Sequence, residues 1–212
     1  VSAKGKQELS YEQAVVYDRV LRFEERDKLM KILYYVYLLD VYMAVANVAK
    51  ERGFVFAKAH PNDKNTLVMK GMFHPFLTKP VGNTIAVDEN SNVIFLTGAN
   101  MAGKSTFMKS FGITVFLAHV GFPVPAKEME FSVQNGMFTT INLPDNLSMG
   151  YSHFYAEVLR VKKVAQQVRQ TQHLIVVFDE LFRGTNVKDA YDATVAVTEA
   201  FAGIRNCTFI IS

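Results

Sequence analysis

The residues best suited to chemistry lie between Gly98 and Ser105, where the sequence reads Gly-Ala-Asn-Met-Ala-Gly-Lys-Ser. This segment fills the phosphate-binding pattern G-x-x-x-x-G-K-[ST] at every fixed position. Its glycines allow the backbone to curl so that several N–H groups point inward, and a following helix adds positive potential. Lys104 can then contact the β- and γ-phosphates, and the Ser105 hydroxyl can ligate Mg²⁺. The segment predicts a nucleoside triphosphate site, and a glycine-rich turn without a ligand is the alternative.

A second group of candidate residues follows residues 174–178, an apolar run that is typical of a strand buried on both faces. Asp179 and Glu180 come directly after this run. A carboxylate at the end of such a strand can hold Mg²⁺ through water, and its neighbour can orient and partly deprotonate an attacking water. The pair therefore predicts a hydrolase, and capping of a following helix is the alternative.

Two further polar residues lie where they could meet a phosphate or another subunit. Ser152 stands near the start of a predicted helix, where it can contact an anion or serve as an ordinary N-cap. Asp189 follows a polar turn at residues 183–186 that could reach a second subunit.

The elements that must position these candidates alternate between strand and helix. Residues 93–97 predict a strand that enters the glycine loop, and the residues from Ser105 onward predict a helix that ends before Pro123. This alternation predicts an α/β domain with a mostly parallel sheet. The other expected elements are strands at 54–56, 66–69, 84–87, 136–140 and 208–211, and helices at 152–170 and 189–202.

Residues 1–52 predict a helical segment that is distinct from a domain at residues 53–212. Ser10 and Gln13 form a capping-box pattern, and Gly53 is suited to end a helix. The span between them holds one long helix, or two antiparallel helices if the chain breaks near the charged residues 24–28. An ordinary core helix and a lever arm both fit this pattern.

Residues 31–46 are apolar enough to suggest a membrane helix. Asp40 stands in their middle, where a spanning helix would lose about 2.5–3.5 kcal/mol, and four tyrosines fit a packed soluble helix better. We therefore expect no membrane partner.

Composition bounds the remaining possibilities. The chain has 212 residues, 50% of them hydrophobic, and a net charge of +3, which permits a nucleic-acid partner without implying one. Its single cysteine excludes an internal disulfide and suits a reducing compartment, so we expect a cytoplasmic protein. The chain begins with Val1 and stops inside an apparent strand, and we expect it to be part of a larger protein.

Several of these segments together resemble the ATPase domain of the MutS DNA mismatch-repair family. The resemblance extends from about Gly71 to Ser212 and is weaker over residues 1–52, which resemble the helices joining the lever and ATPase domains. The segments that carry it are Thr-Gly-Ala-Asn-Met-Ala-Gly-Lys-Ser-Thr at 97–106, His74-Pro75, residues 118–126 and 145–152, and Asp179-Glu180-Leu181 with Arg183-Gly184-Thr185.

The resemblance implies a P-loop NTPase of the ABC type that binds ATP with Mg²⁺, hydrolyses it, and couples its nucleotide state to the binding of mismatched DNA. DNA contact would come through parts of the full protein outside this chain, and a homodimer would form two composite ATP sites. Glu180 and Lys104 would be catalytic, Ser105 and Asp179 would hold the metal, and Ser152 and Asp189 would act in trans. The nucleotide would lie against Gly98, Ala99, Asn100, Met101, Ala102, Gly103, Lys104, Ser105 and Thr106.

This sequence departs from the family pattern at several positions. Phe182 stands where the family has glycine, His153 replaces a threonine, and Val81 is only a weak substitute for an adenine-stacking aromatic. Two other functions stay open: a P-loop small-molecule kinase, which needs an arginine lid and an acceptor pocket, and a scaffold that binds ATP without turnover. The histidines at positions 60, 119 and 173 lack metal-site spacing and are expected to be surface or core polar residues.

Overall fold

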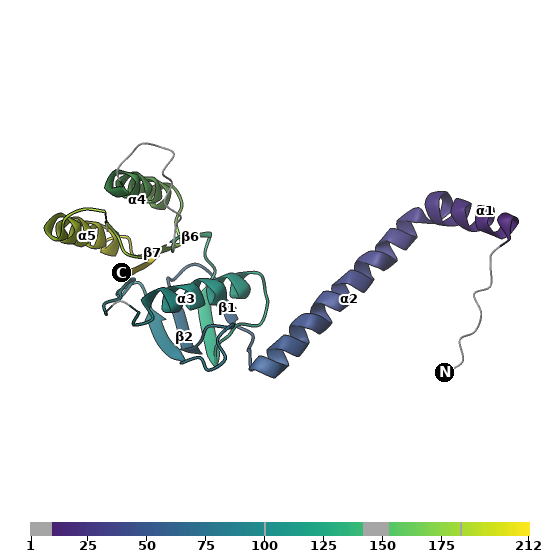
Figure 1. Ribbon diagram of the computed structural model, residues 1–212, viewed down its shortest axis with the longest axis horizontal. Coiled ribbons are helices and arrows are strands. Elements are labelled where there is room, and N and C mark those ends of the chain that lie inside the picture. The colour runs from purple at the N-terminus through teal and green to yellow at the C-terminus, as the bar shows by residue number, and fades with distance from the viewer. Residues whose placement is uncertain (1–9, 100, 142–152, 183) are drawn as a thin grey trace. The chain divides into compact units, whose positions relative to one another are not determined.

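The computed structural model describes residues 10–99, 101–141, 153–182 and 184–212. The chain forms two compact units, Val1–Asn47 and Val48–Ser212, each of which we describe by itself (Figure 1).

The first unit is helical, as the sequence predicts. It contains α1 (Tyr11–Arg19), the π-helical turn η1 (Val20–Glu24) and most of α2 (Arg26–Arg52). The capping box is confirmed, because Gln13 N donates to Ser10 Oγ at 3.2 Å and Ser10 N donates to Gln13 Oε1 at 3.1 Å. The chain breaks at Glu25, within the expected charged run. The antiparallel pairing is wrong, since neither α1 nor α2 buries a residue.

The end of α2 follows from a glycine. Gly53 has a φ of +69°, and Phe54 N donates to Ala49 O at 2.9 Å, the backbone bond of a Schellman cap. Within the described part of the chain, α2 is the one helix long and apolar enough to cross a membrane by length and composition, a test that core helices of soluble proteins also pass. The absence of a membrane partner stays a prediction.

The second unit contains two four-stranded sheets. The sheet that carries the candidate site has the order β4-β8-β7-β6 and is parallel throughout, which confirms the expected α/β class with a parallel sheet. The other has the order β1-β5-β2-β3 and is antiparallel except for the β1–β5 pair. The strands are β1 (Lys58–His60), β2 (Leu67–Met72), β3 (Asn83–Val87), β4 (Val93–Phe95), β5 (Glu128–Ser132), β6 (Gly136–Thr140), β7 (Leu174–Phe178) and β8 (Thr208–Ile211).

The set of expected strands needs two corrections. The expected strand at 54–56 is wrong, because Val55 forms only an isolated bridge to Val124 and the regular strand β1 begins at Lys58. In addition, β5 was not expected, because its charged residues Glu128 and Glu130 alternate with buried apolar ones. This strand lies centrally in the antiparallel sheet. The sequence predicted one mostly parallel sheet, so this second sheet was not expected.

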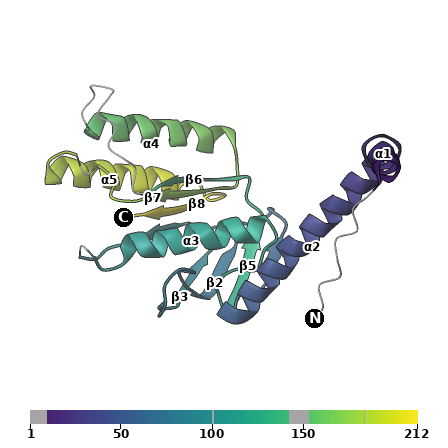
Figure 2. The same ribbon diagram turned by 45° about the vertical axis from the view of Figure 1, so that its right-hand side comes forward.

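Three helices complete the second unit: α3 (Lys104–His119), α4 (His153–Gln170) and α5 (Val187–Ala202). Figure 2 shows α3 between the two sheets, with α4 and α5 on the opposite face of the parallel sheet. The alternation along β7 explains this arrangement. Ile175 and Val177 belong to the core around α3, whereas Leu174, Val176 and Phe178 belong to the core under α4 and α5.

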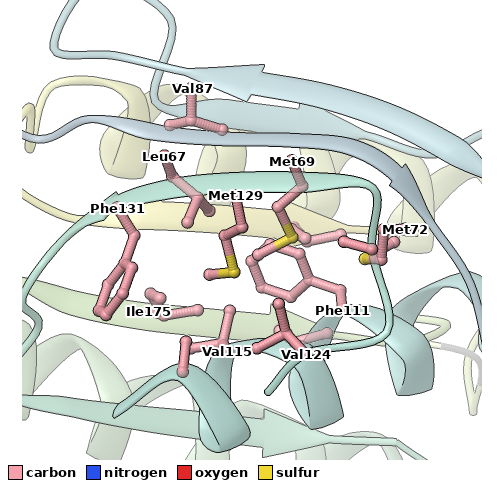
Figure 3. Close-up of a cluster of buried hydrophobic side chains, with 14 of the residues drawn as sticks. Leu67, Met69, Met72, Val87, Phe111, Val115, Val124, Met129, Phe131 and Ile175 are labelled. Atoms are coloured by element: carbon pink, nitrogen blue, oxygen red, sulfur yellow. The ribbon is translucent and has the colours of Figure 1, made fainter. Parts of the chain in front are cut away.

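The core around α3 joins the two sheets. Figure 3 shows Met69 and Met129 of the antiparallel sheet directed toward Phe111 and Val115 of α3. Phe111 is fully buried, and burying one such side chain contributes about 1.5–3 kcal/mol. This core therefore holds α3 firmly behind the glycine loop from which it starts.

A buried asparagine fixes the approach to β4. Asn92 Nδ2 donates to Ile204 O at 2.9 Å and to Cys207 O at 3.2 Å, and Asn92 O accepts from Phe209 N at 2.8 Å. These bonds tie the start of β4 to the connection between α5 and β8.

Candidate phosphate-binding site

The glycine loop joins β4 to α3, as the motif requires. Gly98, Met101 and Gly103 all have positive φ values, of +153°, +66° and +95°. Gly103 is the N-cap of α3 and provides no side-chain bond, while the helical bonding begins where Phe107 N donates to Gly103 O at 2.9 Å. The N–H groups of residues 104–106 therefore have no acceptor within the helix and are suited to bind an anion.

Lys104 lies over this loop. Its Nζ donates to Gly98 O at 2.7 Å and to Ala99 O at 3.4 Å. The ammonium group is thus held beside the N–H groups at the start of α3 and can exchange carbonyl oxygens for phosphate oxygens. Ser105 is half-buried in the first turn of α3, and Thr106 beside it is exposed.

The candidate carboxylates lie at the same edge of the parallel sheet as the loop. Phe95 pairs with Ile211, and Ile211 pairs with Phe178, so the three strands end in one row. One strand, β8, separates the two candidate segments. Two strand spacings of about 4.8 Å place the end of β7 about 10 Å from the end of β4. The glycine loop and the two carboxylates therefore follow strands that are next neighbours but one, with the end of β8 between them.

The residues after β7 are tied to the end of β8. Ser212 N donates to Phe178 O at 3.0 Å, and Leu181 N donates to Ser212 O at 3.2 Å. The Ser212 hydroxyl donates to Asp179 Oδ1 at 3.4 Å, so the half-buried Asp179 carboxylate has a defined orientation. Glu180 is exposed at the same edge.

The comparison with known families agrees with this arrangement. MutS domain V matches residues 94–212, more than half of the chain. The chain belongs to the MutS family.

Curated MutS-family relatives align with most of the chain. It is 30% identical over 203 residues to "DNA mismatch repair protein MutS" of Petrotoga mobilis, covering 93% of this chain and 24% of that protein. The protein of the same name from Geobacillus sp. is 32% identical over 199 residues, which cover 91% of this chain and 22% of that protein. "MutS protein homolog 4" of Mus musculus is 30% identical over 191 residues, which cover 88% of this chain and 19% of that protein. The chain thus spans about a quarter or less of the length of these relatives.

Not every predicted site residue of this MutS-family chain can be placed. Asn100 and Ser152 lie outside the described residues, as do the rest of the polar segment at 142–151 and Arg183. Asp189 lies in the first turn of α5, where its N–H donates to Asn186 Oδ1 at 2.9 Å and its Oδ2 accepts from Asn186 Nδ2 at 2.6 Å. This reciprocal cap explains the aspartate within one chain, and its role toward a second subunit stays a prediction.

The described residues contain no group of three or more His, Cys, Asp and Glu side chains that could hold a metal ion. Protein cages are unusual for Mg²⁺, which is normally held by one or two protein oxygens together with phosphate and water. The Ser105 hydroxyl and the Asp179 carboxylate can provide such oxygen ligands.

Two of the remaining histidines have structural partners. His119 accepts from Gln134 N through Nε2 at 3.0 Å, and its Nδ1 lies 2.8 Å from Val115 O. His60 Nε2 lies 2.9 Å from Glu130 Oε2 at the edge of the antiparallel sheet. The hydrogen bond from His60, assisted by the charge of Lys58, lowers the pKa of Glu130 below its ordinary value. Both histidines are polar structural residues, as expected.

Proposed function

We propose that residues 48–212 bind ATP with Mg²⁺ and hydrolyse it. The observation that carries this proposal is the common position of the uncapped start of α3, Lys104 and the pair Asp179 and Glu180 at one edge of the parallel sheet. Family membership supports the same reaction.

The loop and α3 bind the phosphates. The N–H groups of residues 104–106 donate to phosphate oxygens, and the Lys104 ammonium leaves the Gly98 and Ala99 carbonyls to contact the β- and γ-phosphates. A hydrogen bond to a charged group contributes about 1.5–3 kcal/mol, so the lysine accounts for roughly a 10- to 150-fold gain in affinity.

Ser105 and Asp179 fit the metal. The hydroxyl and the carboxylate are hard oxygen donors, and Ser212 orients the Asp179 carboxylate from the adjacent strand. When bound, Mg²⁺ neutralises charge that develops on the β- and γ-phosphate oxygens.

Glu180 acts on water. Its exposed position at the end of β7, on the sheet edge that also carries the glycine loop, is suited to contact a water molecule beside the phosphates. The carboxylate orients this water toward the γ-phosphate and accepts a proton from it. Phe182, which kept a scaffold without turnover open, is buried with only 3% of its surface exposed, whereas Glu180 beside it is exposed.

The wider role of the protein follows from its relatives. Because they are named as DNA mismatch repair proteins, we propose that ATP binding and hydrolysis control the binding of mismatched DNA by parts of the protein outside this chain. We further propose a cytoplasmic homodimer in which Ser152 and Asp189 contact nucleotide held by the partner subunit.

The decisive experiment measures ATP binding and phosphate release by the full-length protein, with and without mismatched duplex DNA. Lys104→Ala should weaken ATP binding at least tenfold and abolish turnover. Lys109→Ala removes a second lysine of α3, which is exposed and lies beyond the loop, and should leave both unchanged. Equal turnover in the Lys104→Ala variant would contradict the proposal. Tight binding without turnover in the wild type would indicate the scaffold, and transfer of phosphate to a small acceptor would indicate the kinase.

A further inference from the structure

The turn after β7 has an unusual backbone. Glu180 and Phe182 have φ values of +51° and +61°. Only two other non-glycine residues in the described part of the chain, Met101 and His173, share this conformation. A side-chain-bearing residue there costs about 1–2 kcal/mol, so surrounding contacts must hold the turn in place.

Contacts from two directions help to hold the turn in place. Directly after β8, Ser212 O accepts from Leu181 N at 3.2 Å, and the Leu181 side chain packs on the core under α4 and α5. From α4, the ring of Phe154 lies 5.7 Å from the ring of Phe182, with an angle of 54° between the ring planes. Phe182 is 3% exposed, whereas Glu180, two residues earlier, is exposed.

The backbone conformation does not by itself explain a phenylalanine at position 182. A glycine would adopt a φ of +61° at much lower cost, because it has no Cβ. The feature that favours phenylalanine is the buried ring against Phe154, which outweighs the backbone strain.

We propose that Phe182 is a positioning residue for Glu180. Its ring, seated against Phe154, keeps the turn in the left-handed conformation that directs the Glu180 carboxylate toward the sheet edge where the phosphates lie. Without this ring contact, the turn relaxes toward ordinary φ values and the Glu180 carboxylate moves. A displacement of 1 Å can cost about 100-fold in rate. This inference rests on the proposed ATP hydrolysis.

The test separates positioning from ordinary core packing. Phe182→Leu, Phe154→Leu and the double variant are made in the full-length protein, with Phe131→Leu as the matched control. Phe131 is also 3% exposed and has one ring partner, His119, at 4.8 Å, but it lies in the core around α3. For each variant, the melting temperature, the affinity for a non-hydrolysable ATP analogue, and kcat are measured.

We expect Phe182→Leu and Phe154→Leu each to lower kcat at least tenfold while the affinity for the analogue changes less than threefold. The double variant should resemble either single variant, because both changes remove the same contact. Phe131→Leu should lower the melting temperature without changing kcat. Phe182→Met, which fills a similar volume, should recover most of the lost rate.

Unchanged kcat in Phe182→Leu, with a loss of melting temperature like that of Phe131→Leu, would overturn the inference. If Phe182→Leu does not fold, Phe154→Leu decides in the same way, because Phe154 is only half-buried. Failure of the proposed function has a different result: wild-type protein releases no phosphate, or Lys104→Ala releases as much as wild type, and the positioning inference then falls with it.

Discussion

Replacing Gly103 with alanine should destabilise the protein although the new methyl group meets no obstacle. A Cβ at Gly103 would have nothing within 4 Å, but φ is +95°. An L-residue in a left-handed conformation costs about 1–2 kcal/mol, so Gly103→Ala should lower the free energy of unfolding by about that amount. The penalty is purely a backbone effect.

The same helix contains a matched control. Gly112 is buried in the middle of α3, has no positive φ, and would also place a Cβ in open space. Alanine is favoured over glycine inside a helix by about 0.8–1 kcal/mol, so Gly112→Ala should stabilise the protein. The two substitutions remove the same residue type and should have opposite signs.

The assay is equilibrium unfolding in urea, followed by circular dichroism. With a dependence of about 2 kcal/mol per molar urea, Gly103→Ala should lower the midpoint by about 0.5–1 M, and Gly112→Ala should raise it by up to about 0.5 M. A midpoint for Gly103→Ala at or above that of wild type would refute the backbone argument. ATP affinity measured on the same variants should fall for Gly103→Ala alone, because its loop N–H groups would be displaced.

Three further predictions concern residues away from the glycine loop. Asn92→Ala should lower the free energy of unfolding, measured in urea, by about 1–3 kcal/mol, because buried carbonyl groups lose their hydrogen-bond donor. His60→Ala should raise the pKa of Glu130 toward its ordinary value in a carboxyl NMR titration. Because that pKa is depressed in the folded protein, the stability it contributes is present above about pH 4.5 and is lost as the pH falls, and an unchanged titration would contradict this. Burial raises the pKa of the Cys207 thiol above its ordinary value, so iodoacetamide should modify it at pH 8 only after unfolding, and rapid modification of folded protein would count against its burial.

The parallel sheet was largely predictable from the sequence. The boundaries expected for β7 and β8 agree with the structure, because fully buried parallel strands are mostly apolar runs that end at polar residues. The bounds of the partly buried β6 also agree, whereas β4 ends at Phe95, two residues earlier than expected. The start of α3 was also predictable from the glycine and lysine that precede its apolar residues.

The antiparallel sheet was not predictable in the same way. Glu128 and Glu130 interrupt the apolar pattern of β5. Their partners, Lys70 and His60, come from strands that lie about sixty to seventy residues earlier in the chain. Such strands are stabilised by cross-strand pairs, which local composition does not reveal. The reciprocal cap between Asn186 and Asp189 was missed as well, although an asparagine three residues before an aspartate is a pattern that could have indicated it.

By itself, the sequence determined the candidate phosphate-binding loop, since its glycines, lysine and hydroxyl stand at fixed spacing within a few consecutive residues. Only the tertiary structure decided that β8 lies between β4 and β7, and hence that the carboxylates follow a strand about 10 Å from the strand that enters the loop, at the same edge of the sheet. Only the tertiary structure brought the ring of Phe182 against that of Phe154. Strand order and ring contacts depend on packing between distant segments, and no local pattern of residues specifies which segments will meet.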